Sequence, residues 1–385
     1  MPAKILVVDD EPDMEILIRQ RFRKHIRDDV FSFAFATNGV EALRQLETAD
    51  DIDVVLADIN MPEMDGLTLL GKINEGYPWL KVVMVSAYGD MENIRTAMNR
   101  GALDFLTKPI DFNDLEITIV KSLEEASAYK VAKDEHDQLV KLQRELDIAK
   151  NIQLSMLPTE TISPERHACN IHTHIDLARE VGGDFYDYFL LDKERLGFVI
   201  GDVSGKGIPA ALFMMRTRTI LRSIAIQDVS PGVCIQHVNR LLSLENVPNM
   251  FVTLFYGILQ LRSGALEYCN GGHNHPYVVT DDGQFATLSE PGGPIVGAFT
   301  HMEYATHMTK LEPKSTLFMY TDGITEARNH EEEEFSEDRL ESYLADCNVE
   351  SLTEFTQGML KEVAAFVDNG PQTDDMTIMS VQYLG

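Results

Sequence analysis

Aspartates that could bind metal ions recur in four short motifs of the last two-thirds of the chain. The motifs are Gly-Gly-Asp-Phe-Tyr-Asp at 182–187, Gly-Asp-Val-Ser-Gly at 201–205, Thr-Asp-Gly at 321–323 and Thr-Asp-Asp-Met-Thr at 373–377. Each places an aspartate where a strand is expected to end or a tight turn to begin. Because carboxylates that converge inside a protein need a neutralising cation, the set predicts a magnesium or manganese site.

A second group of chemically capable residues follows the apolar runs of the N-terminal third. These runs, at 5–8, 31–35, 54–57, 82–85 and 105–106, alternate with stretches of helical periodicity. The alternation predicts a five-stranded parallel sheet covered by helices on both faces. Ligands bind at the carboxyl ends of the strands in such a fold. The residues expected there are Asp9, Asp10, Asp58, Ser86 and Lys108.

This constellation resembles the receiver domain of two-component response regulators and extends over residues 1–122. The resemblance implies a flavodoxin-like α/β fold in which Asp58 is the phosphoacceptor and forms an acyl phosphate. Lys108 would pair with the phosphoryl oxygens and Ser86 would hydrogen-bond to them. Phe105 would be the aromatic switch residue, without the hydroxyl group of a tyrosine. The implied ligands of a Mg²⁺ ion are Asp9, Asp10, Asp58 and the carbonyl of Asn60.

The four aspartate motifs, in their order along the chain, resemble the PPM family of metal-dependent protein serine/threonine phosphatases, in its SpoIIE-like branch. The segments 145–158, 270–274 and 321–327 extend the resemblance, which runs from about Leu146 to the C-terminus. It implies an α+β sandwich of two antiparallel sheets flanked by helices, with the metals at one end between the sheets. His273 is expected in a loop beside the active site, not on a metal.

The resemblance also assigns the ligands of two Mn²⁺ or Mg²⁺ ions. One metal would be held by Asp184 and Asp202, with the carbonyl of Val203 assisting. The ligands of the other would be Asp202, Asp322 and the Asp374-Asp375 pair, in which Asp374 is favoured as the direct ligand and the choice stays open. A water molecule bridging the two metals would attack the phosphorus, since the cations lower its pKa and bind the phosphoryl oxygens.

Between these regions, residues 117–157 contain neither glycine nor proline, which favours one long helix. The spacing of a set of its residues predicts a coiled-coil seam that pairs with a second copy of the chain: Leu139, Leu142, Leu146, Ala149, Gln153 and Met156. The alternative is a connecting helix that packs on its own phosphatase domain. The predicted domains are thus a receiver at 1–122, a helical linker at 123–160 and a phosphatase at 161–385.

The composition of the chain bears on which partners it can bind and in which compartment it is expected. The 385 residues carry a net charge of −29 and show no cluster of Lys and Arg, which argues against nucleic-acid binding. No apolar run reaches membrane-spanning length, and the N-terminus lacks the pattern of a signal peptide. The four cysteines are scattered without paired spacing, which is typical of reduced thiols in a cytoplasmic protein.

Two classes of function remain. In the first, the chain is an enzyme whose phosphatase activity is controlled by phosphorylation of the receiver. The resemblance implies a cognate histidine kinase, and a phosphorylated STAS-type anti-sigma-factor antagonist as substrate. In the second, a degenerate phosphatase fold binds a sigma or anti-sigma partner without catalysis. The complete set of aspartates favours the enzyme, because an adaptor has no use for converging carboxylates.

Overall fold

The computed structural model describes residues 2–49, 51–87, 90–158, 168–244, 250–347, 349, 351–368 and 370–385. The chain forms two compact units, Met1–Leu142 and Gln143–Gly385. The predicted start of the phosphatase domain, residue 161, lies outside the described residues. Among the helices that are described, none combines the length and the apolar character needed to cross a bilayer.

The first unit is built on a parallel sheet of short apolar strands. In the described residues the sheet has five strands, in the order β2 (Phe31–Ala36), β1 (Ala3–Val8), β3 (Val54–Asp58), β4 (Lys81–Ala87) and β5 (Asp104–Lys108). The central strand β3 is buried along its whole length, as expected for a sheet with helices on both faces. The predicted five-stranded parallel sheet is therefore confirmed.

Helices connect these strands, and two of them begin at capping side chains. Asn38 accepts a hydrogen bond from the backbone of the first turn of α3 (Gly39–Thr48), and Asp65 does the same for α4 (Gly66–Gly76). The remaining helices are α1 (Pro12–Arg21), α2 (Arg23–Arg27) and α5 (Met91–Asn99). The short α2 was not predicted. It begins after Phe22, which is fully buried in the core at the junction with α1.

One helix, α6 (Phe112–Met156), runs from the end of the first unit into the second. Its beginning packs on the receiver: Leu115 and Ile119 lie in the receiver core. Farther along, Lys130 pairs with Asp53 at 2.7 Å, and Lys133 lies over the Trp79 ring at 5.1 Å. This part of the helix, which precedes the predicted seam, is thus in contact with its own N-terminal unit.

The two ends of the predicted seam differ. Leu139 and Leu142 are 66% and 51% exposed, so their side chains are open to a second copy. Gln153 is buried, and Leu154 and Leu157 pack against the core of the second unit. At this end the alternative interpretation holds, and the placement of Gln153 in an intermolecular seam is wrong.

The second unit contains two antiparallel sheets, each of five strands in the described residues. The first has the order β13 (His307–Lys310), β10 (Ala265–Gly271), β9 (Val252–Gln260), β8 (Arg195–Val203) and β7 (Phe185–Leu190). The second has the order β12 (Phe285–Thr287), β11 (Tyr277–Val279), β14 (Thr316–Tyr320), β15 (Met376–Tyr383) and β6 (Cys169–Asp176).

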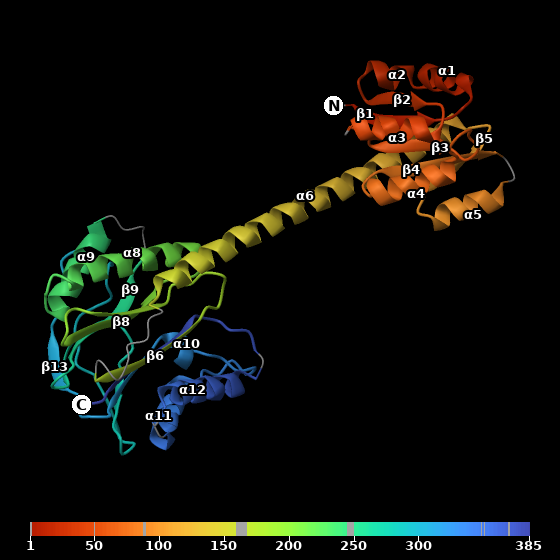
Figure 1. Ribbon diagram of the computed structural model, residues 1–385. Helices are drawn as coiled ribbons and strands as arrows, with labels where there is room; N and C mark the ends of the chain where they lie inside the picture. The colour runs from red at the N-terminus through yellow and green to blue at the C-terminus, as the bar shows by residue number, and fades with distance from the viewer. Residues whose placement is uncertain are drawn as a thin grey trace. The chain divides into compact units, whose positions relative to one another are not determined.

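Helices cover the outer faces of this pair of sheets. The helices α8 (Ile208–Ala225) and α9 (Pro231–Leu244) lie along the sheet that contains β8 and β9, and α11 (Ser336–Asp346) and α12 (Leu352–Val367) lie beyond β6 (Figure 1). A single turn, α10 (Asp322–Thr325), follows β14. The expected α+β sandwich with flanking helices is confirmed.

Alternation along β14 shows how the layers are built. Leu317 and Met319 belong to the core between the sheets, whereas Phe318 and Tyr320 belong to the core beneath α11 and α12. Both faces of the strand are therefore apolar, and the run was recognisable from sequence. The strand β6 was not predicted, although its residues, Cys-Asn-Ile-His-Thr-His-Ile-Asp, show the alternation of apolar and polar side chains typical of a half-buried antiparallel strand.

Candidate phosphoacceptor and metal sites

The receiver aspartates converge at the carboxyl ends of two adjacent strands. Asp9 and Asp10 follow β1, and Asp58 ends β3. One carboxylate oxygen of each lies within 4.8 Å of those of the other two. Burial raises the pKa of Asp9, and the charge of Asp58 adds to the rise. Three carboxylates in this position provide the hard oxygen donors that a magnesium ion takes, so the residues fit the predicted ion.

Lys108 neutralises this cluster from the end of β5. Its Nζ lies 2.5 Å from Asp58 Oδ2, 3.0 Å from Asp9 Oδ2 and 2.9 Å from Glu11 Oε1. Partial burial opposes the charge of the ammonium group, but the hydrogen bonds to Asp58, Glu11 and Asp9 raise the pKa of Lys108 above its ordinary value. Sequence reasoning missed Glu11, since an exposed glutamate after two aspartates carries no distinctive signal.

Two other predicted receiver residues, Asn60 and Ser86, lie beside Asp58 along the chain and on the neighbouring strand. The backbone N–H of Asn60 donates to Asp58 Oδ1 at 3.2 Å. Ser86 is fully buried on β4, the strand that pairs with β3. Gly66 lets the chain pass closely, because a Cβ there would lie 2.1 Å from the Asp58 carbonyl oxygen. Phe105 on β5 is 37% exposed and stands apart from these polar contacts.

In the second unit, Asp184 joins the two sheets. Its carboxylate, just before β7, accepts hydrogen bonds of 2.7 Å at Oδ2 from the hydroxyls of both Thr321 and Thr377. These threonines lie at the adjacent ends of β14 and β15 in the opposite sheet. Burial raises the pKa of Asp184 well above its usual range, and the charges of Asp202 and Asp375 contribute.

The carboxylates of Asp202 and Asp322 are close enough to neighbouring carboxylates to repel them. Asp202 lies near the end of β8, and Asp322 begins α10 directly after β14. Burial, followed by the charge of Asp322, raises the pKa of Asp202 to about 7. Burial, followed by the charge of Glu326, raises the pKa of Asp322 to about 6. A divalent cation would relieve this mutual repulsion, so the donor set fits the predicted metals. Within the described residues, however, no three of these carboxylates approach one another within 4.8 Å.

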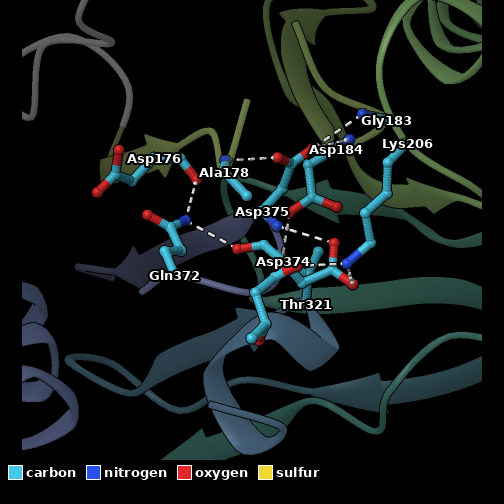
Figure 2. Close-up of polar contacts among 10 residues, drawn as sticks. Asp176, Ala178, Gly183, Asp184, Lys206, Thr321, Gln372, Asp374 and Asp375 are labelled. Atoms are coloured by element: carbon cyan, nitrogen blue, oxygen red, sulfur yellow. Dashed lines mark hydrogen bonds and ion pairs between the residues drawn. The ribbon is translucent and has the colours of Figure 1, made fainter. Parts of the chain in front are cut away.

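The adjacent Asp374 and Asp375 have different contacts, which Figure 2 shows. Asp375 Oδ1 accepts from the Ala178 amide at 2.8 Å, and Oδ2 accepts from the amides of Gly183 and Asp184 at 2.9 and 3.4 Å. Its carboxylate is thus turned toward the backbone. Asp374 is half-buried, and its Oδ2 lies 2.8 Å from Nζ of Lys206.

The glycines beside the aspartates lie so close to other parts of the chain that no side chain fits there. A Cβ at Gly182 would lie 2.0 Å from Asp375 Oδ2, and one at Gly183 would lie 2.8 Å from the Val203 carbonyl oxygen. A Cβ at Gly323 would lie 2.0 Å from the Asp375 carbonyl oxygen. Any side chain at these positions would displace the loops that carry Asp184, Val203 and Asp375.

Two buried residues of the motifs lie beside the aspartates. His273 Nδ1 lies 3.0 Å from Thr253 Oγ1, and Thr253 pairs with Asp202 across the β8–β9 ladder. Burial lowers the pKa of His273 to about 4, so its ring is neutral. This is the expected place in a loop beside the site. Asp187, the last residue of the first motif, instead forms ion pairs with Arg218 and Arg222 of α8.

Comparisons with known proteins match both units. The model of the family described as Stage II sporulation protein E (SpoIIE) matches residues 192–384, and that of the response regulator receiver domain matches residues 5–120. The SiaA-PP2C domain of Pseudomonas aeruginosa has a similar fold, with a TM-score of 0.56 and 21% identity. That match covers 64% of this chain and 98% of that one.

Among curated proteins, Protein IcfG of Synechocystis sp. is 31% identical over 264 residues, covering 62% of this chain and 41% of that protein. Phosphoserine phosphatase RsbU of Bacillus subtilis is 30% identical over 205 residues, covering 52% of this chain and 60% of RsbU. The chain therefore spans about half the length of these relatives. Because the family model covers half of this chain and includes three of its four aspartate motifs, the chain belongs to the SpoIIE family and carries a response regulator receiver domain.

Proposed function

We propose that this chain is a protein phosphatase whose activity is controlled by phosphorylation of Asp58. The observation that carries the proposal is the placement of Asp184, Asp202 and Asp322 beside β7, near the end of β8 and directly after β14, with Asp184 bonded to Thr321 next to Asp322. Burial and neighbouring charges raise the pKa values of these carboxyl groups. A folded protein that crowds carboxylates in this way, without arginine partners for them among its described ion pairs, is suited to binding divalent cations.

The phosphatase residues have distinct proposed roles. Asp184, Asp202 and the Val203 carbonyl would hold one Mn²⁺ or Mg²⁺, and Asp202, Asp322 and Asp374 would hold a second. When bound, the cations supply an activated water molecule and neutralise phosphoryl charge. Thr321 and Thr377 orient the carboxylate of Asp184 through their hydroxyls. Asp375, bonded to three amides, holds the loop before Asp184 in place.

The receiver residues support the acceptor role of Asp58. Asp9 and Asp10 would bind Mg²⁺ together with Asp58 and the Asn60 carbonyl, and Lys108 lies close enough to contact a phosphoryl group on Asp58. The phosphoryl donor would be a cognate histidine kinase, in keeping with the receiver match. Ser86 would hydrogen-bond the phosphoryl oxygens, and Phe105 would respond as the aromatic switch residue.

The proposed substrate is a phosphoserine or phosphothreonine of a STAS-type anti-sigma-factor antagonist. RsbU is named a phosphoserine phosphatase, which supports hydrolysis of a phosphorylated hydroxyl side chain. A homodimer through the exposed leucines of α6 would carry the signal from the receiver, with phosphorylation raising phosphatase activity.

A direct assay tests the proposal against a non-catalytic adaptor. The full chain would be incubated with a phosphoserine protein, with Mn²⁺ or Mg²⁺, and with or without beryllofluoride as a mimic of aspartyl phosphate. Release of phosphate that requires the cation and rises with the mimic is expected. If no condition releases phosphate, while the chain still captures a sigma or anti-sigma protein, the adaptor function replaces the enzyme.

A further inference from the structure

Lys206 lies in the loop that connects Asp202 to helix α8. It is flanked by Gly205 and Gly207, whose φ angles of 88° and 73° lie in the left-handed region that favours glycine. A Cβ built at Gly205 would meet no described atom within 4 Å, so the loop around Lys206 is open. The side chain of Lys206 is itself 38% exposed. A long, flexible lysine on such a loop can change its partner without moving the core.

The ammonium group of Lys206 contacts the loop that bears Asp374. Its Nζ lies 2.8 Å from Asp374 Oδ2 (Figure 2). It also donates to the Thr373 carbonyl. Among the described ion pairs of the second unit, Lys206 supplies the cation that pairs with Asp374, one of the proposed metal ligands there. Its charge also opposes the rise in the pKa of Asp322. A lysine ammonium group therefore partly neutralises these carboxylates.

An ammonium ion and a divalent cation cannot share one carboxylate oxygen without strong repulsion. Lys206 binds a carboxylate oxygen of Asp374. The carboxylate of Asp374 has fewer hydrogen bonds from backbone amides than that of Asp375, so Asp374 is the better candidate for a metal ligand. Once it has left Asp374, Lys206 remains tethered beside the site, where a phosphoryl dianion must approach a cluster of carboxylates. Lysine binds phosphate as a point charge.

From this geometry we infer that Lys206 exchanges partners during the reaction: it pairs with Asp374 in the metal-free enzyme, releases it when a divalent cation binds, and then contacts the phosphoryl group of the substrate. Lys206 is thereby a competitor of the metal and a substrate-binding residue in the same site. This inference rests on the proposed phosphatase function, which it deepens. It predicts opposite effects of one substitution on metal affinity and on substrate affinity.

The test uses Lys206→Gln, which removes the charge and keeps most of the length, and Lys206→Arg, which retains the charge. Lys193→Gln, at an exposed position of the same unit, is the matched control. Isothermal titration with Mn²⁺ in the absence of substrate measures the metal dissociation constant of each full-length variant. Steady-state hydrolysis of a phosphoserine peptide at saturating Mn²⁺ measures KM and kcat.

For Lys206→Gln, the Mn²⁺ dissociation constant should fall at least about threefold, since the metal no longer displaces an ammonium group. KM for the peptide should rise about tenfold or more, because the phosphoryl group loses a charged partner. Lys206→Arg and Lys193→Gln should bind Mn²⁺ with affinities close to that of the wild type. Lys206→Arg should also keep most of its affinity for the peptide.

Weaker or unchanged Mn²⁺ binding by Lys206→Gln would overturn the inference, because it would make Lys206 a structural support of the loop. An unchanged KM would show that Lys206 does not contact the phosphoryl group of the substrate, and would overturn that part of the inference. The metal titration does not depend on catalysis, so it remains decisive if the wild type fails to hydrolyse the peptide. That failure would count against the proposed function instead.

Discussion

Gln153, near the end of α6, makes both available hydrogen bonds to the peptide groups of Gly182. Its Nε2 donates to the Gly182 carbonyl at 2.8 Å, and its Oε1 accepts from the Gly182 amide at 3.2 Å. Gly182 lies two residues before Asp184, and it also lies against the carboxylate of Asp375. A shift of this helix end would therefore move the loop that carries a proposed metal ligand.

The first prediction concerns this bond pair. Gln153→Ala removes two buried hydrogen bonds and leaves the Gly182 groups without their partner, so the phosphatase unit should lose about 1–3 kcal/mol of unfolding free energy. Phosphatase activity should fall more than stability alone explains, because the loop of Asp184 loses its support. Chemical denaturation and activity would be measured on the same samples. Gln143→Ala, at an exposed position of the same helix, is the control and should change neither.

The second prediction concerns the charge of the metal set. Asp202→Asn and Asp322→Asn should each abolish hydrolysis of a small aryl phosphate, since a neutral amide removes charge that the cations require. Both variants should remain folded by circular dichroism. Activity at the wild-type level in the Asp202 variant, or in EDTA, would refute the phosphatase function.

The third prediction concerns pH and the metal-free state. Because the pKa of Asp202 is raised to about 7 in the folded protein, the protonated form stabilises the fold, and that contribution disappears as the pH rises through about 7. Without metal, the wild type should thus lose stability between about pH 4 and about pH 8 relative to Asp202→Asn, by a few kcal/mol. Thermal unfolding in EDTA across this range measures the difference. Parallel curves for the two proteins would show that Asp202 is ionised throughout.

Metal affinity should follow the same titration. Asp202 and Asp322 must lose their protons to bind a cation, so Mn²⁺ binding should release protons and weaken from about pH 8 to about pH 5. Titrations in two buffers with different ionisation enthalpies give the number of protons released. A Mn²⁺ dissociation constant that does not change over this interval would contradict the raised pKa values.

The fourth prediction separates acceptance from transmission in the receiver. Asp58→Asn should not be labelled by acetyl phosphate in the presence of Mg²⁺, whereas Lys108→Ala should still accept some phosphate but fail to raise phosphatase activity. Lys108 contacts Asp58, Asp9 and Glu11 at once. Its removal therefore leaves a phosphoryl group on Asp58 without the cation that would bind it. Labelling of Asp58→Asn at the wild-type level would show that another residue is the nucleophile.

The fifth prediction concerns the exposed leucines of α6. Leu142→Glu should prevent pairing of the helices and uncouple phosphatase activity from beryllofluoride, because a charge buried in a seam is costly. Metal binding should be unchanged. Lys141→Glu, at the exposed neighbouring position, is the control for charge. Sedimentation and activity would be compared, and a monomeric wild type that still responds to beryllofluoride would exclude this route.

Patterns that are local in sequence were sufficient to predict much of this protein. The continuous apolar strands of the receiver and the helical runs of α8, α9, α11 and α12 were recognisable because their periodicity reports burial directly. Strands of only three or four residues, such as β11 and β13, were not predicted, because a run that short carries no clear periodicity and is stabilised by its partners in the sheet.

The aspartate motifs, their order and the position of Asp58 at the end of a strand were thus predicted from the sequence alone, since residue types and strand ends suffice to recognise them. Only the tertiary structure decided which way each side chain faces. Asp375 turns to the amides of the loop before Asp184, and Asp374 turns to Lys206. Gln153 packs on Gly182 instead of on a second copy. The physical reason is that these choices depend on contacts between segments up to 197 residues apart, which no local pattern encodes.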